Sequence, residues 1–417
     1  MSDKAKLRDD CFALPSGVVW TPVDAALSHL RAEMRPVAGI ETLPAGLAAG
    51  RILAAPVVAG RDNPPWTNAA VDGYGFDGAA CPAGSLSLPL VSGRAAAGAP
   101  FAGTLRPGSA LRILTGAALP LGVDTVVLEE DVTLKSGRVE IPAGWKRGAN
   151  TRPKGEDVKA DAPLLDAGRT LRAPDLALLA AAGVAAVQVR RPLRVAVLST
   201  GDELAPDGAP PQAHQIPDAN RPMLLALIRA WGMAPVDLGQ APDTEAGVAE
   251  SLDRGARADA ILTTGGASAG DEDHISRALR QAGTLALWRI AVKPGRPLAL
   301  GLWRGVPIFG LPGNPVAAFT CALIFARPAL LALAGGGWRP AEGITVPAGF
   351  AKTKKAGRRE FLRARLREGR AEVFASEGSG RVSGLAWAEG FVELPDDAGS
   401  VQPGDPVRYL PFRAFGL

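Results

Sequence analysis

Residues 194–204 read RVAVLSTGDEL, and residues 259–273 read DAILTTGGASAGDED. Each segment begins with a continuous apolar run, which is typical of a strand buried on both faces of a parallel sheet. Each run ends in a loop that contains glycine, and a helical pattern follows. This alternation predicts a doubly wound α/β domain over residues 191–335, with ligand-binding loops beyond the carboxyl ends of its strands.

The other elements expected in this domain keep the same alternation. They are helices at Asn220–Trp231, Thr244–Gly255 and Asp271–Gln281, and strands at Leu285–Val292, Pro297–Leu302 and Val306–Phe309. Asn314 and Pro315 are expected to cap and start a long helix, because proline is favoured at the first helical position. The apolar stretch Pro315–Gly335 contains Arg327 and Pro328, so we interpret it as a buried helix rather than a membrane span.

The flanking segments have different patterns. Thr21 is expected to cap a helix at Val23–Met34, and another helix is expected at Ala173–Ala182. Residues 61–150 carry frequent Gly and Pro between short apolar runs such as Ala110–Leu114, which predicts a β-rich module. The predicted domains are an N-terminal helical and linker region (1–60 with 151–190), a β-rich insertion (61–150), the α/β domain (191–335) and a small C-terminal β-barrel (340–417).

Composition and charge exclude several classes of protein. Hydrophobic residues make up 47% of the 417, so a disordered chain is excluded, and Lys+Arg 46 against Asp+Glu 42 gives a net charge of +4. This balance, without a long basic tract, argues against nucleic-acid binding. Cys11, Cys81 and Cys321 form no CxxC pair, and the charged N-terminus shows no secretory signal. A cytoplasmic protein with reduced thiols is therefore expected.

Acidic residues accompany the glycines in both strand-end loops. Gly265 and Gly266 allow the backbone to approach a ligand closely, whereas Asp202, Glu203 and Asp273 would repel a bare phosphate. A Mg²⁺ ion held between carboxylates and phosphate oxygens would explain both features. Asp and Glu in the first turn of a helix are also ordinary capping residues, which is the alternative interpretation.

Two further loops contain groups suited to anions. Residues 289–297, RIAVKPGRP, place Lys293 at a tight turn, where it can neutralise an oxyanion; a basic surface turn is the alternative. Residues 310–315, GLPGNP, place Gly313 before the capped helix, and a purely structural cap is the alternative there. The sequence contains no HExxH motif and no Cys/His zinc pattern.

Taken together, these strings resemble the molybdopterin molybdenumtransferases, the family of MoeA and the gephyrin E domain. The matching strings are, in order, NAAVDGYGF, RILTGAALP, NTRPKGEDV, STGDEL, IPDANR, TTGGASAGDEDH, RIAVKPGRP and LPGNP, from Asn68 to Pro315. Gly357–Phe361 and Gly378–Ser379 extend the resemblance toward the C-terminus. It implies a homodimer that inserts molybdate into adenylylated molybdopterin, with Mg²⁺ assisting cleavage of the pyrophosphate bond and release of AMP and molybdenum cofactor.

The resemblance also implies roles for individual residues. Catalytic roles fall on Asp72, Glu203, Asp273 and Lys293, and metal-binding roles on Glu203, Asp243 and Asp273. Asp72 is expected to act in the α/β site of the partner protomer. Ligand-binding roles fall on Thr115, Asp157, Thr200, Gly201, Asp202, Gly265, Gly266, Ser268, Gly270, Arg289, Pro312, Gly313, Asn314, Arg358 and Ser379.

The chain departs from the family pattern at a few positions. His274 and Gly380 stand where the family usually has Tyr and His, and Arg296 replaces Lys in the KPG turn. Two alternatives stay open: a non-catalytic molybdopterin-binding scaffold of the same fold, and the related adenylyltransferase, which resembles residues 191–335 only. The β-rich module and an intact Asp72 favour the enzyme. Its implied protein partners are that adenylyltransferase and the molybdoenzyme apoproteins.

Overall fold

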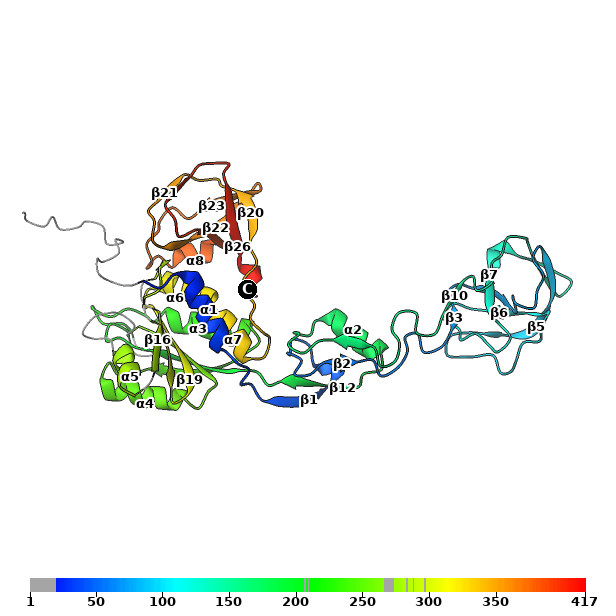
Figure 1. Ribbon diagram of the computed structural model, residues 1–417, viewed down its shortest axis with the longest axis horizontal. Helices are drawn as coiled ribbons and strands as arrows, with labels where there is room; N and C mark the ends of the chain where they lie inside the picture. The colour runs from blue at the N-terminus through cyan, green and yellow to red at the C-terminus, as the bar shows by residue number, and fades with distance from the viewer. Residues whose placement is uncertain are drawn as a thin grey trace, which may run out of the picture. The chain divides into compact units, whose positions relative to one another are not determined.

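The computed structural model describes residues 20–205, 208, 210–265, 274–282, 284–287, 289–295 and 298–417 (Figure 1). The chain divides into a larger unit, Met1–Glu41 with Arg190–Leu417, and a smaller unit, Thr42–Val189. The larger unit therefore contains the predicted α/β region together with the first helix and the C-terminal strands.

A six-stranded mixed sheet forms the centre of the α/β region. Its order is β14 (Ala234–Gln240), β13 (Arg194–Ser199), β15 (Ala260–Thr264), β19 (Val306–Leu311), β18 (Ala299–Trp303) and β16 (Thr284–Leu287). The first four strands are parallel, as the sequence predicts, whereas β18 runs in the opposite direction and pairs antiparallel with both β19 and β16. The reversal follows from a tight hairpin at Arg304 and Gly305, which both have positive φ, as a type I′ turn requires.

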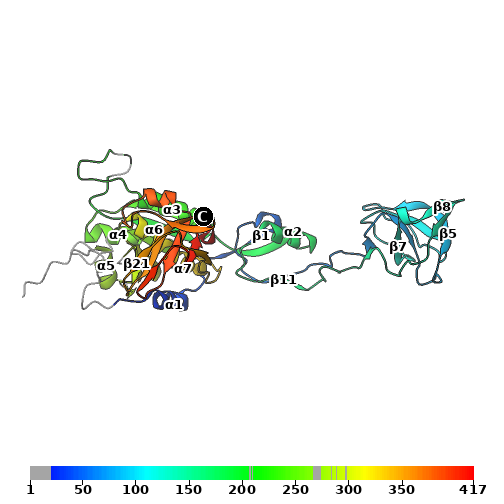
Figure 2. The same cartoon turned by 90° about the horizontal axis from the view of Figure 1, so that it is seen from above.

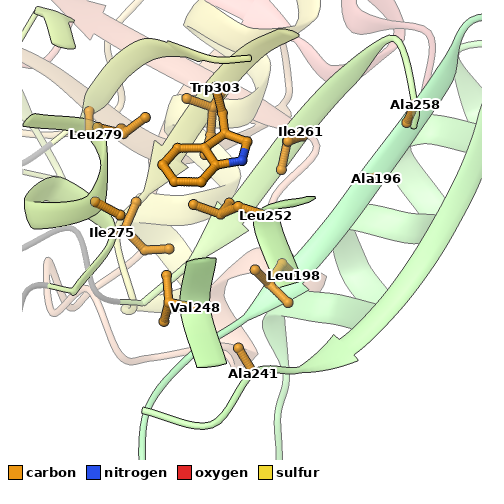
Figure 3. Packing of buried hydrophobic residues seen from close by; sticks show 13 residues of the cluster. Ala196, Leu198, Ala241, Val248, Leu252, Ala258, Ile261, Ile275, Leu279 and Trp303 are labelled. Carbon is orange, nitrogen blue, oxygen red and sulfur yellow. The ribbon is translucent and has the colours of Figure 1, made fainter. Parts of the chain in front are cut away.

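Helices cover both faces of this sheet, as a doubly wound fold requires. On one face, α4 (Glu245–Gly255) and α5 (His274–Ala282) pack through Leu252 and Ile275 against Leu198, Ile261 and Trp303 (Figure 3). On the other face, α3 (Asn220–Ala230) packs on β13 and β14. Side chains alternate along β13, so its buried valines point toward α3. The predicted helices here are confirmed to within a residue or two, except that the start of α5 borders residues outside the described ranges.

The long apolar helix is buried and changes its winding in the middle. It comprises α6 (Pro315–Cys321), a π-helical segment η3 (Ala322–Ala326) and α7 (Arg327–Leu333). The wider π turn precedes Pro328, which has no N–H to donate to the preceding turn. Pro315–Leu333 is long and apolar enough to cross a membrane, but 83% of that window is buried inside the protein. This burial agrees with its interpretation as a core helix.

The C-terminal sheet includes one strand that the sequence does not predict. Its order is β17 (Val292–Lys293), β22 (Arg359–Arg367), β24 (Gly390–Leu394), β26 (Pro406–Pro411) and β20 (Ile344–Pro347), with β23 (Arg370–Val373) on β22. The prediction of a single strand at Leu285–Val292 is wrong, because the segment forms two strands. β16 joins the α/β sheet, and β17 joins the C-terminal sheet. Arg289, with a φ of 62°, breaks the extended run between them. The region also contains β21 (Lys352–Lys354), β25 (Gly399–Val401) and α8 (Ser383–Trp387).

The first helix of the larger unit is bonded to the C-terminal sheet. It is α1 (Val23–Glu33), and its N-cap is Pro22 rather than the predicted Thr21. Thr21 is instead held extended, because its N–H donates to Arg289 O and its carbonyl accepts from the N–H of Ala291. Arg359 donates from both Nη atoms to the Asp24 carboxylate at 2.7 Å, which fastens α1 to β22.

The smaller unit is rich in β-strands, and the β-rich pattern predicted for residues 61–150 is confirmed by the strands found there (Figures 1 and 2). Its main sheet has the order β7 (Thr125–Leu128), β4 (Gly73–Phe76), β6 (Ala110–Ile113), β5 (Leu86–Ala95), β9 (Arg138–Ile141) and β8 (Thr133–Lys135). Apolar cores lie around Phe76 and around Leu111. Its other elements are α2 (Ala173–Ala181) and the strands β1 (Ile40–Pro44), β2 (Val57–Val58), β3 (Asn68–Ala69), β10 (Thr151–Arg152), β11 (Pro163–Leu165) and β12 (Ala186–Arg190).

Candidate functional site

The ends of β13 and β15 meet at a point where only glycine fits. Thr200 N–H donates to Thr264 O at 3.0 Å, so the two strand ends lie side by side. Gly265 follows with a φ of +84°, and a Cβ on it would lie 2.2 Å from Thr200 O. Gly201 has a φ of +135°. Glycine at 265 therefore allows a close backbone approach that a larger residue would block, and glycine at 201 allows a backbone conformation that L side chains rarely adopt.

Asn220, at the start of α3, connects this point to the end of β19. Its side-chain amide donates to Thr264 Oγ1 and to Gly313 O, both at 2.6 Å, and the residue is 5% exposed. Asn220 belongs to the motif IPDANR, and the sequence alone predicts no role for it. An asparagine beside an apolar helical pattern was the available signal, because a buried amide needs hydrogen-bond partners.

Several buried polar atoms at the strand ends lack a partner among the described residues. They are Ser199 Oγ, Thr200 Oγ1, Thr263 Oγ1 and Asn220 Oδ1. Native proteins pair most buried polar groups with protein, water or ligand. A polar ligand or ordered water at this edge of the sheet would satisfy those atoms that face it.

The Asn220 contacts lead to a stability prediction. Replacing Asn220 with alanine removes one buried and one partly buried hydrogen bond and leaves Thr264 Oγ1 less well satisfied, so we expect a loss of about 1–3 kcal/mol in the free energy of unfolding. Urea unfolding measures it. The control is Asn314→Ala, because Asn314 is exposed and its side chain makes no capping hydrogen bond. An equal loss in both variants would contradict the role given to Asn220.

The GLPGNP loop adopts the predicted cap geometry but not the predicted cap bond. Asn314 is the N-cap of α6 and Pro315 is its first residue. Pro312 is buried, whereas Gly313 and Asn314 are exposed. Pro312 O lies 3.5 Å from Thr264 Oγ1, so this loop adjoins the end of β15.

The predicted metal-binding carboxylates are only partly within the described residues. Glu203 is exposed and folds back over Gly201, where a Cβ would lie 2.3 Å from Glu203 Oε2. Asp202 is exposed and Asp243 is half-buried ahead of α4. Asp273, with Gly266, Ser268 and Gly270, lies outside the described ranges. Carboxylates suit Mg²⁺ in kind, but the described residues hold no group of three side chains that could bind a metal.

Lys293 lies in an ion-pair cluster that the sequence did not predict. Its Nζ donates to Glu377 Oε2 at 2.7 Å and lies 3.4 Å from Glu360 Oε1. Lys352 contacts the same two carboxylates. Burial alone would raise the pKa of Glu377, but the hydrogen bonds from Lys293 and Lys352 hold that pKa below its usual value. Residues 293 and 377 are far apart in sequence, so local pattern could not pair them.

The other C-terminal candidates border the start of α6. Ser379 O accepts a hydrogen bond from Val316 N–H at 3.0 Å. A Cβ on the neighbouring Gly380 would lie 3.9 Å from Asn314 Oδ1, so the position that departs from the family pattern adjoins the GLPGNP loop. Arg289 is half-buried before β17, and Arg358 is half-buried just before β22.

The remaining candidates belong to the smaller unit. Asp72 is exposed, and its Oδ1 accepts from both the N–H and the Oγ1 of Thr115 at 2.6 Å. These hydrogen bonds lower the pKa of Asp72 below its ordinary value of 3.8. Asp157 accepts from Asn63 Nδ2 at 2.8 Å. The two hydrogen bonds from Thr115 therefore hold the Asp72 carboxylate in place and favour its ionised form.

Comparisons with known proteins agree along most of the chain. Family models match residues 21–183 (MoeA N-terminal region, domain I and II), 196–332 (probable molybdopterin binding domain) and 345–412 (MoeA C-terminal region, domain IV). The chain is 35% identical to a molybdopterin molybdenumtransferase of Haemophilus influenzae, over 88% of this chain and 92% of that protein. It is 34% identical to molybdopterin molybdenumtransferase 2 of Mycobacterium tuberculosis, over 90% and 96%.

A solved structure shows the same fold. The crystal structure of the molybdopterin biosynthesis MoeA protein from Pyrococcus horikoshii superposes with a TM-score of 0.82 at 30% identity, over 94% of this chain and 99% of that one. The similarity therefore extends over both units and not only over the α/β region.

Proposed function

Because this chain belongs to the molybdopterin molybdenumtransferase family and is a transferase of molybdenum cofactor biosynthesis, we propose that it inserts molybdate into adenylylated molybdopterin. In this reaction the dithiolene receives molybdenum, the pyrophosphate bond is cleaved, and AMP and molybdenum cofactor leave. The observation that carries the proposal is the convergence of the ends of β13, β15 and β19 at Gly265 and Asn220. Ligands of open α/β sheets bind at such strand ends.

The pterin and its nucleotide would lie along this edge of the sheet. The ligand-binding residues we assign there, within the described part, are Thr200, Gly201, Asp202, Gly265, Pro312, Gly313 and Asn314. The glycines among them, Gly201, Gly265 and Gly313, allow a planar, polar ligand to approach the backbone closely. Gly266, Ser268 and Gly270, assigned by resemblance, complete the set.

Charge neutralisation is the main chemical requirement of the reaction. Molybdate is a dianion and the pyrophosphate develops charge as it breaks, so Lys293, Arg289 and Arg358 are assigned to the oxyanions. Glu203, Asp243 and Asp273 would hold Mg²⁺, which supplies further positive charge at the phosphate oxygens. The carboxylates that remain free of the metal can carry protons to oxygens leaving molybdenum.

In this proposal the protein acts as a homodimer in the cytoplasm. Asp72, which accepts two hydrogen bonds from Thr115 in the smaller unit, would act in the site of the partner protomer. The predicted four-domain division is retained in this proposal, with the β-rich insertion of residues 61–150 carrying Asp72. Substrate would come from the molybdopterin adenylyltransferase, and product would pass to molybdoenzyme apoproteins.

The direct test is AMP release. Purified protein mixed with adenylylated molybdopterin, molybdate and Mg²⁺ is expected to release AMP, measured by chromatography, and to release less when molybdate or Mg²⁺ is omitted. Binding of the pterin without any AMP release would overturn the enzyme proposal and favour the scaffold.

A further inference from the structure

A small pocket is lined in part by the ion-pair cluster of Lys293. Its volume is about 190 Å³, and its lining includes Lys293, Val316, Lys352, Arg363, Phe374 and Glu377. The two lysine side chains are 14% and 13% exposed. Two nearly buried ammonium groups in one small pocket require anionic partners, because unpaired buried charge is strongly unfavourable.

The two carboxylates that serve these lysines differ in exposure. Glu360 lies on β22, its side chain is 9% exposed, and it approaches both ammonium groups, at 3.4 Å and 3.3 Å. Glu377 lies on the loop before Ser379, and its side chain is 42% exposed. Glu360 is therefore the fixed counter-ion, and Glu377 is the one that solvent or a ligand can reach.

The loop that carries Glu377 is held independently of its carboxylate. Arg363 donates from Nη1 to Arg381 O at 2.7 Å and from Nη2 to Gly378 O at 3.2 Å and to Ser376 O. Because these bonds go to backbone carbonyls, rotation of the Glu377 side chain does not require the loop to move.

Displacement of Glu377 would create a site for an anion. Without its carboxylate, Glu360 stays between Lys293 and Lys352, and the pocket gains one positive charge beside the guanidinium of Arg363. A carboxylate held between two ammonium groups makes the charge-assisted hydrogen bonds that an oxyanion would make.

We propose that Glu377 is a tethered counter-anion, which occupies an oxyanion position between Lys293 and Lys352 and is displaced when a tetrahedral dianion enters the pocket. This inference rests on the proposed function, which assigns Lys293 to an oxyanion. Anion affinity is then set by competition with Glu377. The displaced carboxylate turns toward solvent, where it is already partly exposed.

The test is direct binding of molybdate, measured by calorimetry in low-salt buffer with the full chain. Glu377→Gln keeps the shape of the side chain but removes its charge, so molybdate is expected to bind about 10-fold more tightly. The gain should shrink at high ionic strength, because the site is partly exposed. Lys352→Met in the Glu377→Gln background should remove most of the gain. Glu377→Asp, which keeps the charge on a shorter side chain, should give a smaller gain.

The matched control is Glu372→Gln. Glu372 is 43% exposed and pairs with Arg365 at 3.1 Å on the same sheet, but it does not line the pocket. Its removal should leave molybdate affinity unchanged. Unchanged or weaker binding by Glu377→Gln, with the melting temperature retained, would overturn the proposal. Absence of binding in every variant would do the same. Neither result bears on AMP release by the unmodified chain, which tests the proposed function separately.

Discussion

Replacing Asp72 with alanine is expected to reduce AMP release by at least about 100-fold, the scale of a lost acid–base or charged catalytic group, while the chain stays folded. The carboxylate is exposed and bonded through one oxygen to Thr115 alone among its described hydrogen-bond partners, so its loss leaves no buried cavity. AMP release and the circular dichroism melting curve are the two measurements. Turnover within a few-fold of the unmodified chain would refute the role of Asp72.

Two companion variants separate charge from position. Asp72→Asn keeps an oxygen that can accept from Thr115, so a loss of activity as large as that of Asp72→Ala, with a low residual rate, would show that the charge is required. Thr115→Val removes the side-chain hydrogen bond but keeps the carboxylate, so a partial loss is expected. The control is Asp131→Asn, an exposed aspartate of η2 (Glu129–Asp131) in the same unit, which should retain activity.

The direction of the Asp72 pKa shift predicts how the contribution of Asp72 to activity depends on pH. Hydrogen bonds from Thr115 stabilise the ionised form and lower the pKa of Asp72 below 3.8. The carboxylate is therefore ionised from neutral pH down through pH 5, and it is protonated only as pH falls below 3.8. The activity ratio of the unmodified chain to Asp72→Asn should stay constant between pH 5 and pH 8. A ratio that falls across that interval would contradict the assignment.

Mixed dimers test whether Asp72 serves the partner protomer. In a dimer of Asp72→Ala with Lys293→Ala, one shared site keeps both groups if Asp72 acts across the interface. Random mixing of two inactive chains should then restore about a quarter of full activity, since half of the dimers are mixed and one of their two sites is intact. No restoration, with mixed dimers demonstrated by differential tags, would place Asp72 and Lys293 in the same protomer's site.

Local pattern predicted the strands and helices of the α/β region because their apolar spacing is strong. The buried runs at Arg194–Ser199 and Ala260–Thr264 are confirmed as β13 and β15. The prediction from this pattern is wrong at Leu285–Val292, where an apolar run typical of one strand forms parts of two. Nothing in hydropathy indicates that Arg289 takes a positive φ there and sends the chain into a second sheet.

The candidate site divides in the same way. Glycines after buried strands are recognisable from sequence, because their position alone predicts a close backbone approach. The structure confirms this approach at Gly265. Asn220, Glu360 and Glu377 could not be found by spacing. Each acts through a partner more than 40 residues away, at Thr264 or Lys293. Such pairings depend on how the sheets meet, which local periodicity does not encode.

Replacing Gly265 with alanine is the second change from which we expect a large effect. Its φ of +84° costs an L-residue roughly 1–2 kcal/mol. The new Cβ would also lie 2.2 Å from Thr200 O and 3.1 Å from Thr200 Oγ1. The end of β13 must therefore move, which breaks the bond between Thr200 N–H and Thr264 O and widens the edge that would hold the pterin.

Gly305→Ala is the matched control for Gly265→Ala. Gly305 has a φ of +80°, but nothing lies within 4 Å of its Cβ position, and it sits in the hairpin at the opposite end of β19. Both variants carry the same backbone strain, so their difference measures the close approach. We expect Gly305→Ala to lose about 1 kcal/mol in urea unfolding and to bind adenylylated molybdopterin normally, whereas Gly265→Ala loses about 2–4 kcal/mol and binds at least about 100-fold more weakly. Equal stability and equal binding in the two variants would mean that contact between the strand ends has no part in ligand binding.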